Sequence, residues 1–126
     1  MRHHYQLTKL GRNRNQRQAL FKQLAVALIT HERLTTTAAK AKVLKGLIDK
    51  LGRIARKNTL ASRRQLIALL GQKPAAHKLM DEISKRSQDR AGCLTRSVRL
   101  GERRGDKAML VRVEFIDKPQ PKEVKK

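Results

Sequence analysis

The residues best suited to chemistry in this chain are arginines and lysines, and the clearest group lies in one short loop. The segment Gly101-Glu102-Arg103-Arg104-Gly105-Asp106 has a glycine near each end, so the chain can turn sharply there. Two adjacent guanidinium groups at its centre can each donate several hydrogen bonds. We therefore expect this loop to present two charged forks to a binding partner.

Basic residues also dominate the chain as a whole. Its 126 residues include 31 Lys and Arg but only 10 Asp and Glu, which gives a net charge of +21. The two signs are not mixed, because no carboxylate precedes Glu32 and none lies between Asp49 and Asp81. A surface charged only for solubility normally intersperses both signs. The pattern therefore predicts a polyanionic partner, and a nucleic acid is the usual one.

Catalysis and metal binding have little support in the sequence. His3, His4, His31 and His77 lie in four different contexts, and no nearby Cys or carboxylate completes a metal site with the first two. Cys93 is the only cysteine, and we expect a small, partly buried thiol rather than a nucleophile. No phosphate-binding glycine loop of the mononucleotide type occurs. The sequence thus predicts no enzyme, no cofactor and no small-molecule substrate.

Composition also bears on the mode of binding and on location. Tyr5, Phe21 and Phe115 are the only aromatic residues, too few for a platform that stacks bases. We therefore expect recognition of the backbone and shape of a structured nucleic acid. No apolar run can span a membrane, no signal segment follows the first residues, and one cysteine fits a reducing compartment. We expect the whole chain to be the mature protein, in the cytoplasm and without a membrane partner.

Four helices and three strands are expected to position the basic residues. Apolar periodicity and capping residues predict helices from Asn13 or Asn15 to about His31, from Ala38 to Lys57, from Leu60 to Leu70, and from Pro74 to about Ser87. A short strand is expected near Leu34–Thr36, and Leu94–Ile116 has the alternation of a hairpin. Its apolar faces are expected to carry Leu94, Val98 and Leu100 on one strand, and Met109, Val111, Val113 and Phe115 on the other.

The sequence divides into a basic N-terminal arm at 1–17, a globular domain at 18–117 and a disordered tail at 118–126. The arm is expected to be mobile in the free protein and to become ordered when it contacts phosphate. One face of the helix at 38–57 carries Lys42, Lys45, Arg53 and Arg56, and we expect phosphate contacts there. Arg63 and Arg64 fall in the first turn of the helix at 60–70, where the helix dipole does not favour cations. Their placement there suggests that Arg63 and Arg64 have a role other than stabilising the helix.

Several motifs, in the same order along the chain, resemble the bacterial large-subunit ribosomal protein seventeen family. They are Met1-Arg2-His3, Lys9-Leu10-Gly11-Arg12, Arg17-x-Ala19-Leu20, the segment from His31-Glu32-Arg33-Leu34 through Ala39-Lys40-Ala41-Lys42-x-Leu44, Arg63-Arg64, Thr95-Arg96, Gly101-x-Arg103-Arg104-Gly105-Asp106, and Asp117. The likeness spans about Met1 to Asp117. Because separate motifs recur in the family's order, chance similarity is a poor explanation.

The resemblance implies an α+β fold, with about four helices packed on a small three-stranded mixed sheet. It implies a structural protein of the large ribosomal subunit that binds ribosomal RNA near the peptide exit tunnel, beside neighbouring ribosomal proteins. It also implies RNA contacts for Arg2, His3, Arg12, Arg17, Lys40, Lys42, Arg96, Arg103 and Arg104. Charge and position add Lys9, Arg14, Arg63 and Arg64 as RNA-binding candidates.

Three other functions remain open from the residues alone. An architectural DNA-binding protein would share the charge, and it would bind duplex DNA and ribosomal RNA equally well. An RNA-modifying enzyme is disfavoured because no catalytic set is visible. A membrane-surface peptide is disfavoured because the apolar helix faces are expected to pack in a core.

Overall fold

The computed structural model describes residues 8–118, and Met1–Leu7 and residues 119–126 lie outside the described part. The expected division into arm, domain and tail stays a prediction, because the described residues begin inside the arm and end at the first residue of the tail. RNA-binding candidates Arg2 and His3 fall outside the described residues as well.

The first two helices follow their sequence signals closely. Helix α1 (Arg14–His31) starts after Asn13, whose backbone N–H donates to the Gln16 side chain at 3.4 Å. A Gln three residues after an Asn is one half of a capping box. Helix α2 (Ala38–Arg56) follows Thr37 directly and buries its apolar face, as expected.

Helix α3 (Leu60–Leu70) has the predicted bounds. The Thr59 hydroxyl accepts a hydrogen bond from the Ser62 backbone N–H at 3.1 Å, and the helix ends at Gly71 with φ +72°. The expected fourth helix is a continuous helical segment in three parts: α4 (Lys73–Lys78), the π-helical turn η1 (Leu79–Ile83) and α5 (Ser84–Arg86). Because a π turn is rare and occurs mostly as a single turn inside an α-helix, the sequence predicts one uninterrupted helix here.

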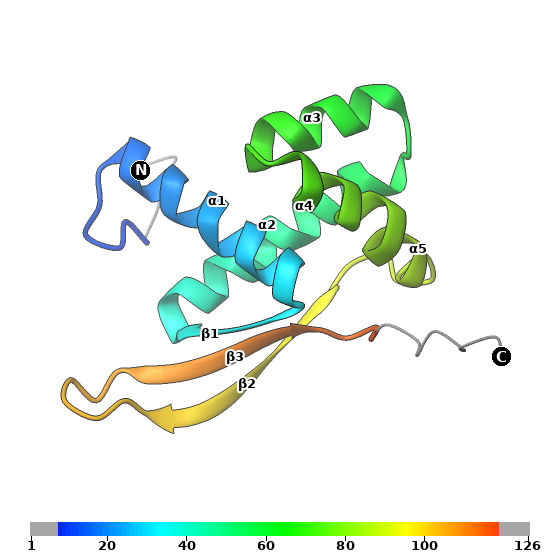
Figure 1. Cartoon of the computed structure of the whole chain (residues 1–126). Helices are drawn as coiled ribbons and strands as arrows, with labels where there is room; N and C mark the ends of the chain where they lie inside the picture. Colours follow the sequence, from blue (N-terminus) through cyan, green and yellow to red (C-terminus); the bar gives the residue numbers. More distant parts are fainter. Residues whose placement is uncertain (1–7, 119–126) are drawn as a thin grey trace, which may run out of the picture.

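The sheet has the order β1-β3-β2, with β1 (Arg33–Thr37), β2 (Thr95–Glu102) and β3 (Met109–Phe115). Both pairings are antiparallel, so the expected mixed sheet is wrong in that respect. β1 and β2 do run in the same direction, but β3 lies between them and they do not pair. The helices cover one face of this sheet and leave the other bare (Figure 1).

The core lies between the helices and the covered face of the sheet. It contains buried residues from α1, α2, α3, α4, η1 and β3 and from the segment before β2: Ala25, Leu28, Ile29, Ala41, Leu44, Ile48, Leu51, Ala55, Leu66, Leu70, Ala75, Ala76, Leu79, Met80, Ile83, Leu94, Val111, Val113 and Phe115. This confirms the expected apolar face of β3, except at Met109, which is exposed.

The expected apolar face of the first hairpin strand is wrong. Val98 pairs with Arg112, so it lies on the bare face of the sheet, and Leu100 lies at a bulge between Arg99 and Gly101. Both side chains are exposed, by 38% and 47%. Only Leu94 is buried, because it precedes the strand and is turned inward after a residue with positive φ.

That preceding residue is Cys93, which has φ 54° and an exposed side chain. The expectation of a partly buried thiol is therefore wrong. The backbone conformation that directs Leu94 into the core leaves its neighbour at the surface.

Candidate nucleic-acid interface

The hairpin loop is held in one shape by its own hydrogen bonds. Gly101 has φ +123° and Gly105 has φ +103°, a region that side chains disfavour. The Arg103 backbone N–H donates to the Ala108 carbonyl at 2.9 Å. The Arg103 Nε donates to Asp106 Oδ1 at 3.0 Å, and a second guanidinium nitrogen contacts the other carboxylate oxygen. The sequence signal for a sharp turn is confirmed.

The two arginines of the loop consequently differ. The Arg103 guanidinium, together with the Ala108 backbone N–H, holds the pKa of Asp106 well below its usual range. Arg104 is exposed, and within residues 8–118 it has neither a salt bridge nor a side-chain hydrogen bond. Arg104 is therefore the more available cation, whereas Arg103 also shapes the loop.

A basic groove lies between α2 and β2. It has a volume of about 360 Å³, with Ala38, Ala41 and the buried Val111 among its lining residues. Its polar lining consists of Lys42 and Lys45 from α2 and of Ser97 and Arg99 from β2, and it includes no carboxylate. We call these four residues the basic groove set.

The groove set was only partly anticipated. The sequence predicts Lys42 as an RNA-binding residue and Lys45 as part of a helix face that contacts phosphate, but it does not indicate Arg99. The strand register supplies the missing signal. Ser97 pairs with Val113 and Arg99 with Val111, so both point to the helix-covered side of the sheet. Arg99 therefore lines the groove beside the buried Val111 and opposite the first half of α2.

The bare face of the sheet carries arginines around one carboxylate. The Arg96 Nε donates to the Glu114 carboxylate at 2.6 Å, and this hydrogen bond lowers the pKa of Glu114 below its usual value. Arg33 lies opposite Glu114 in the register of β1 and β3. Arg112 lies two residues before Glu114 on the same face of the sheet. The Arg112 Nε is buried without a hydrogen-bond partner among the described residues. Arg96 is thus on an exposed, basic face but is already ion-paired.

The described part of the arm forms a turn before α1. The Arg12 backbone N–H donates to the Lys9 carbonyl at 3.2 Å, and the Arg12 side chain donates to the Leu10 carbonyl at 2.9 Å. Arg17 reaches back from α1 to the Arg12 carbonyl at 3.3 Å. Lys9 and Arg14 are exposed. Several candidate cations of the arm are therefore gathered at the start of α1.

The candidates on α3 lie elsewhere. Arg63 forms a salt bridge with Asp81 of η1 at 3.1 Å, so it has an intramolecular partner in spite of its unfavourable position in the first helical turn. Arg64 is exposed. The start of α3 and the tip of the hairpin are at opposite ends of the molecule in Figure 1. The described part of the arm (residues 8–17), the start of α2 and the hairpin tip lie at the end away from the start of α3 (Figure 1).

Part of the conspicuous motif at 31–44 has a structural role. Glu32 ends α1 in a left-handed conformation with φ 61°. Its carboxylate accepts two hydrogen bonds from Arg86, at 3.0 and 3.2 Å, and lies 3.2 Å from the Lys78 ammonium. Burial alone would raise the pKa of Glu32, but the contacts with Arg86 and Lys78 hold it below its usual value. This carboxylate ties the α1–β1 junction to the helical segment at 73–86.

Between residues 8 and 118 there is no cluster of three or more His, Cys, Asp or Glu side chains suited to a metal ion. In the same range, no helix combines the length and the apolar character needed to cross a membrane.

Comparison with known proteins identifies the family. The family model described as ribosomal protein L17 matches residues 20–116. The chain belongs to this family. It is 46% identical over 116 residues to the large ribosomal subunit protein bL17 of Thermomicrobium roseum, an alignment that covers 92% of this chain and 99% of that protein. The resemblance seen in the sequence motifs is therefore confirmed.

Two further relatives agree with this assignment. The large ribosomal subunit protein bL17 of Bradyrhizobium diazoefficiens is 41% identical over 94% of this chain and 86% of its own length. The protein of the same name from Helicobacter pylori is 42% identical over 92% of this chain and its full length. The chain therefore spans most or all of the length of each relative.

Proposed function

We propose that this member of the L17 family binds ribosomal RNA through phosphate and shape contacts made by its basic surface. The family membership makes the chain a structural constituent of the large ribosomal subunit, in the cytoplasm, that supports translation without catalysis. It also implies association with large-subunit RNA and with other ribosomal proteins. The finer questions are which surface meets RNA and how.

The basic groove set is the observation that carries this proposal. Three cationic side chains from two elements, together with the Ser97 hydroxyl, surround a groove that no carboxylate lines. Within the described residues, Lys42, Lys45 and Arg99 have no salt bridge of their own. Unpaired like charges that share a groove repel one another, and a phosphate bound between them removes that repulsion.

The remaining candidates extend this surface. We propose RNA contacts for Arg2, His3, Lys9, Arg12, Arg14, Arg17, Lys40, Lys42, Arg63, Arg64, Arg96, Arg103 and Arg104, and we add Lys45 and Arg99. Those near the start of α2 and the hairpin tip are supported by their shared end of the molecule (Figure 1). Arg63 and Arg96 would have to exchange or share their carboxylate partners.

The shape of the fold supports contact with packed RNA segments. The hairpin projects beyond the helices as a narrow extension with Arg104 at its tip (Figure 1). A thin basic extension can reach between phosphate backbones that a globular face could not enter. The resemblance to the family further supports a position near the peptide exit tunnel, beside neighbouring ribosomal proteins.

The test compares two variants with the same net charge. Replacing Lys42, Lys45 and Arg99 by Gln lowers the net charge from +21 to +18 (21 − 3). Replacing the exposed Lys57, Lys73 and Lys85 by Gln does the same outside the groove. Affinity for a large-subunit ribosomal RNA fragment is measured as a function of salt. Each lost phosphate contact should lower the salt slope by about 0.7 to 0.9.

The groove variant should therefore lose about two to three units of slope, whereas the control should lose much less. Equal losses in the two variants would mean that only total charge matters and would remove the groove from the interface. Equal wild-type affinity for duplex DNA of the same length would favour the architectural DNA-binding alternative.

A further inference from the structure

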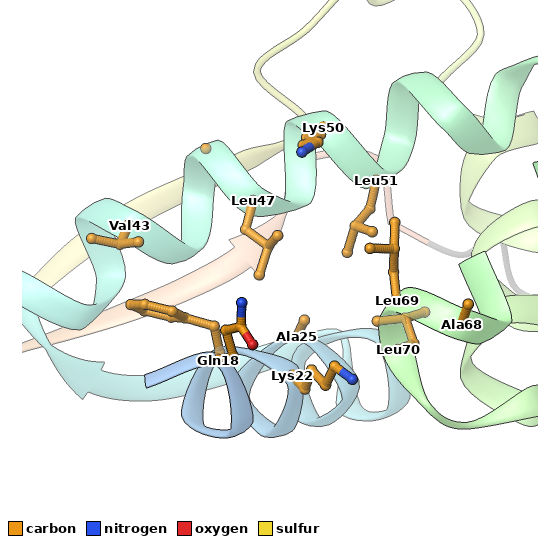
Figure 2. A pocket seen from close by; sticks show the side chains of 12 residues that line it. Gln18, Lys22, Ala25, Val43, Leu47, Lys50, Leu51, Ala68, Leu69 and Leu70 are labelled. Carbon is orange, nitrogen blue, oxygen red and sulfur yellow. The ribbon is translucent and has the colours of Figure 1, made fainter. Parts of the chain in front are cut away.

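A second, chemically different pocket lies between the first three helices. It has a volume of about 640 Å³ and is lined mainly by apolar side chains, including Phe21 from α1, Val43 and Leu47 from α2, and Leu69 from α3. Figure 2 shows Val43, Leu47 and Leu69 pointing toward this space. Leu69 is 39% exposed. An apolar surface of this kind cannot satisfy the charge of a phosphate backbone.

Its charged residues are all of one sign. Lys22 on α1 and Lys50 on α2 come from the two opposing helices, and the lining residues include no carboxylate (Figure 2). Both lysines are exposed. An occupant with acidic groups beside an apolar side chain would complement both the apolar lining and the lysines. A second copy of this chain, with its net charge of +21, would instead be repelled.

The two glycines of α2 give an independent indication. Glycine inside a helix is less favourable than alanine, so its presence calls for a packing reason. Gly52 has one, because a Cβ built there would lie 2.2 Å from Leu94 Cδ1. Gly46 has no such packing reason within this chain, because a Cβ built there would meet no atom within 4 Å. Gly46 does line the apolar pocket, so the close approach of another molecule would explain it.

We infer that this pocket docks an apolar side chain of a neighbouring protein in the large ribosomal subunit, carried by a segment with Asp or Glu beside it. The pocket accepts the apolar group between Phe21, Leu47 and Leu69, over the gap left by Gly46. Lys22 and Lys50 pair with the flanking carboxylates. The inference rests on the membership of the chain in the subunit, but not on the groove set as its RNA contact.

The test places a photoreactive benzoylphenylalanine at Leu69 of the full chain, within purified large subunits that have incorporated it. The matched control carries the same group at Leu60, an exposed leucine of the same helix about 13 Å along its axis. Irradiation at Leu69 should give an adduct with another subunit protein, and the crosslinked peptide should contain an apolar residue within about four positions of Asp or Glu. The Leu60 control should not give this adduct.

An adduct with RNA, with a second copy or with this chain itself would overturn the inference, as would no adduct or a peptide without carboxylates. A further variant, Lys22→Glu with Lys50→Glu, should lower the adduct yield about tenfold, and an unchanged yield would remove the lysines from the contact. The same variant is measured for RNA affinity against Lys57→Glu with Lys73→Glu. Equal RNA affinity of the two double variants separates this result from a failure of the proposed RNA interface.

Discussion

The two glycines of α2 should respond in opposite ways to the same substitution. Gly52→Ala places a Cβ 2.2 Å from Leu94 Cδ1, about 1.3 Å short of a normal carbon contact of ~3.5 Å. Leu94 cannot retreat easily, because its side chain is 3% exposed and its backbone N–H donates to Asp49 Oδ1 at 3.0 Å. Gly46→Ala meets no neighbouring atom within 4 Å.

The expected magnitudes follow from two opposing effects. Alanine is better than glycine in a helix by about 1 kcal/mol, and this gain applies to both variants. Forcing an extra methyl group into a packed core costs about 1–3 kcal/mol, and this loss applies only to Gly52→Ala. Gly46→Ala should therefore be more stable than the wild type by about 1 kcal/mol. The two variants should differ from each other by ~1–3 kcal/mol.

The assay is urea unfolding of the free protein, followed by circular dichroism and analysed by linear extrapolation. Leu94→Ala provides the matched background, because it removes the side chain that Gly52→Ala would meet. In that background Gly52→Ala should lose its penalty, with a coupling of about 1–3 kcal/mol between the two positions. Equal unfolding free energies for Gly46→Ala and Gly52→Ala would refute the reasoning, since they would show that Leu94 poses no steric barrier.

Three further predictions concern charged side chains. Glu32→Gln should destabilise the fold by about 2 kcal/mol at neutral pH, because it leaves Arg86 and Lys78 without their carboxylate. The folded pKa of Glu32 lies below its ordinary value of 4.5, so this stabilisation is present above that value and is lost as the pH falls through the folded pKa. Unfolding of wild type and variant across pH 2–7 should therefore converge at the acid end, and a constant difference would contradict the assignment. In the hairpin loop, Arg104→Ala should weaken RNA binding and flatten its salt slope by about one unit without altering the fold. Arg103→Ala should in addition raise the pKa of Asp106 toward its usual value, which carboxyl chemical shifts would report; an unshifted Asp106 would mean that Arg103 does not hold it.

The helical part of the fold was predictable because its signals are local. Capping at Asn13 and Thr59, the stop at Gly71 and the apolar repeat of α2 depend on residues within one or two turns. The sheet was less predictable, because pairing is decided by distant segments. Nothing near β1 indicates that its partner would be β3, and the outward orientation of Val98 follows from the register with Arg112.

The candidate site was also predictable only in part. Charge alone identified the right kind of residue, but it could not separate cations that have a partner from cations that do not. Arg63 and Arg103 are held by Asp81 and Asp106, whereas Arg99 gains its place in the groove from strand register. The apolar pocket was not foreseen, because its lining residues from α1, α2 and α3 each look like ordinary core positions in sequence.

The strand order β1-β3-β2 has a consequence for the way the chain folds. β2 and β3 are joined by a short loop, so their hairpin can form from local contacts. β1 is different, because its residues Arg33 and Leu34 pair with Glu114 and Val113. All the other helices and strands except α1 lie between these partners in the sequence. Closing so long a segment has an entropic cost that only the assembled helices can reduce. We therefore predict that β1 joins the sheet after the hairpin of β2 and β3 has formed. A chain that ends before Met109 would leave β1 without its partner strand, while the local helical contacts could still form.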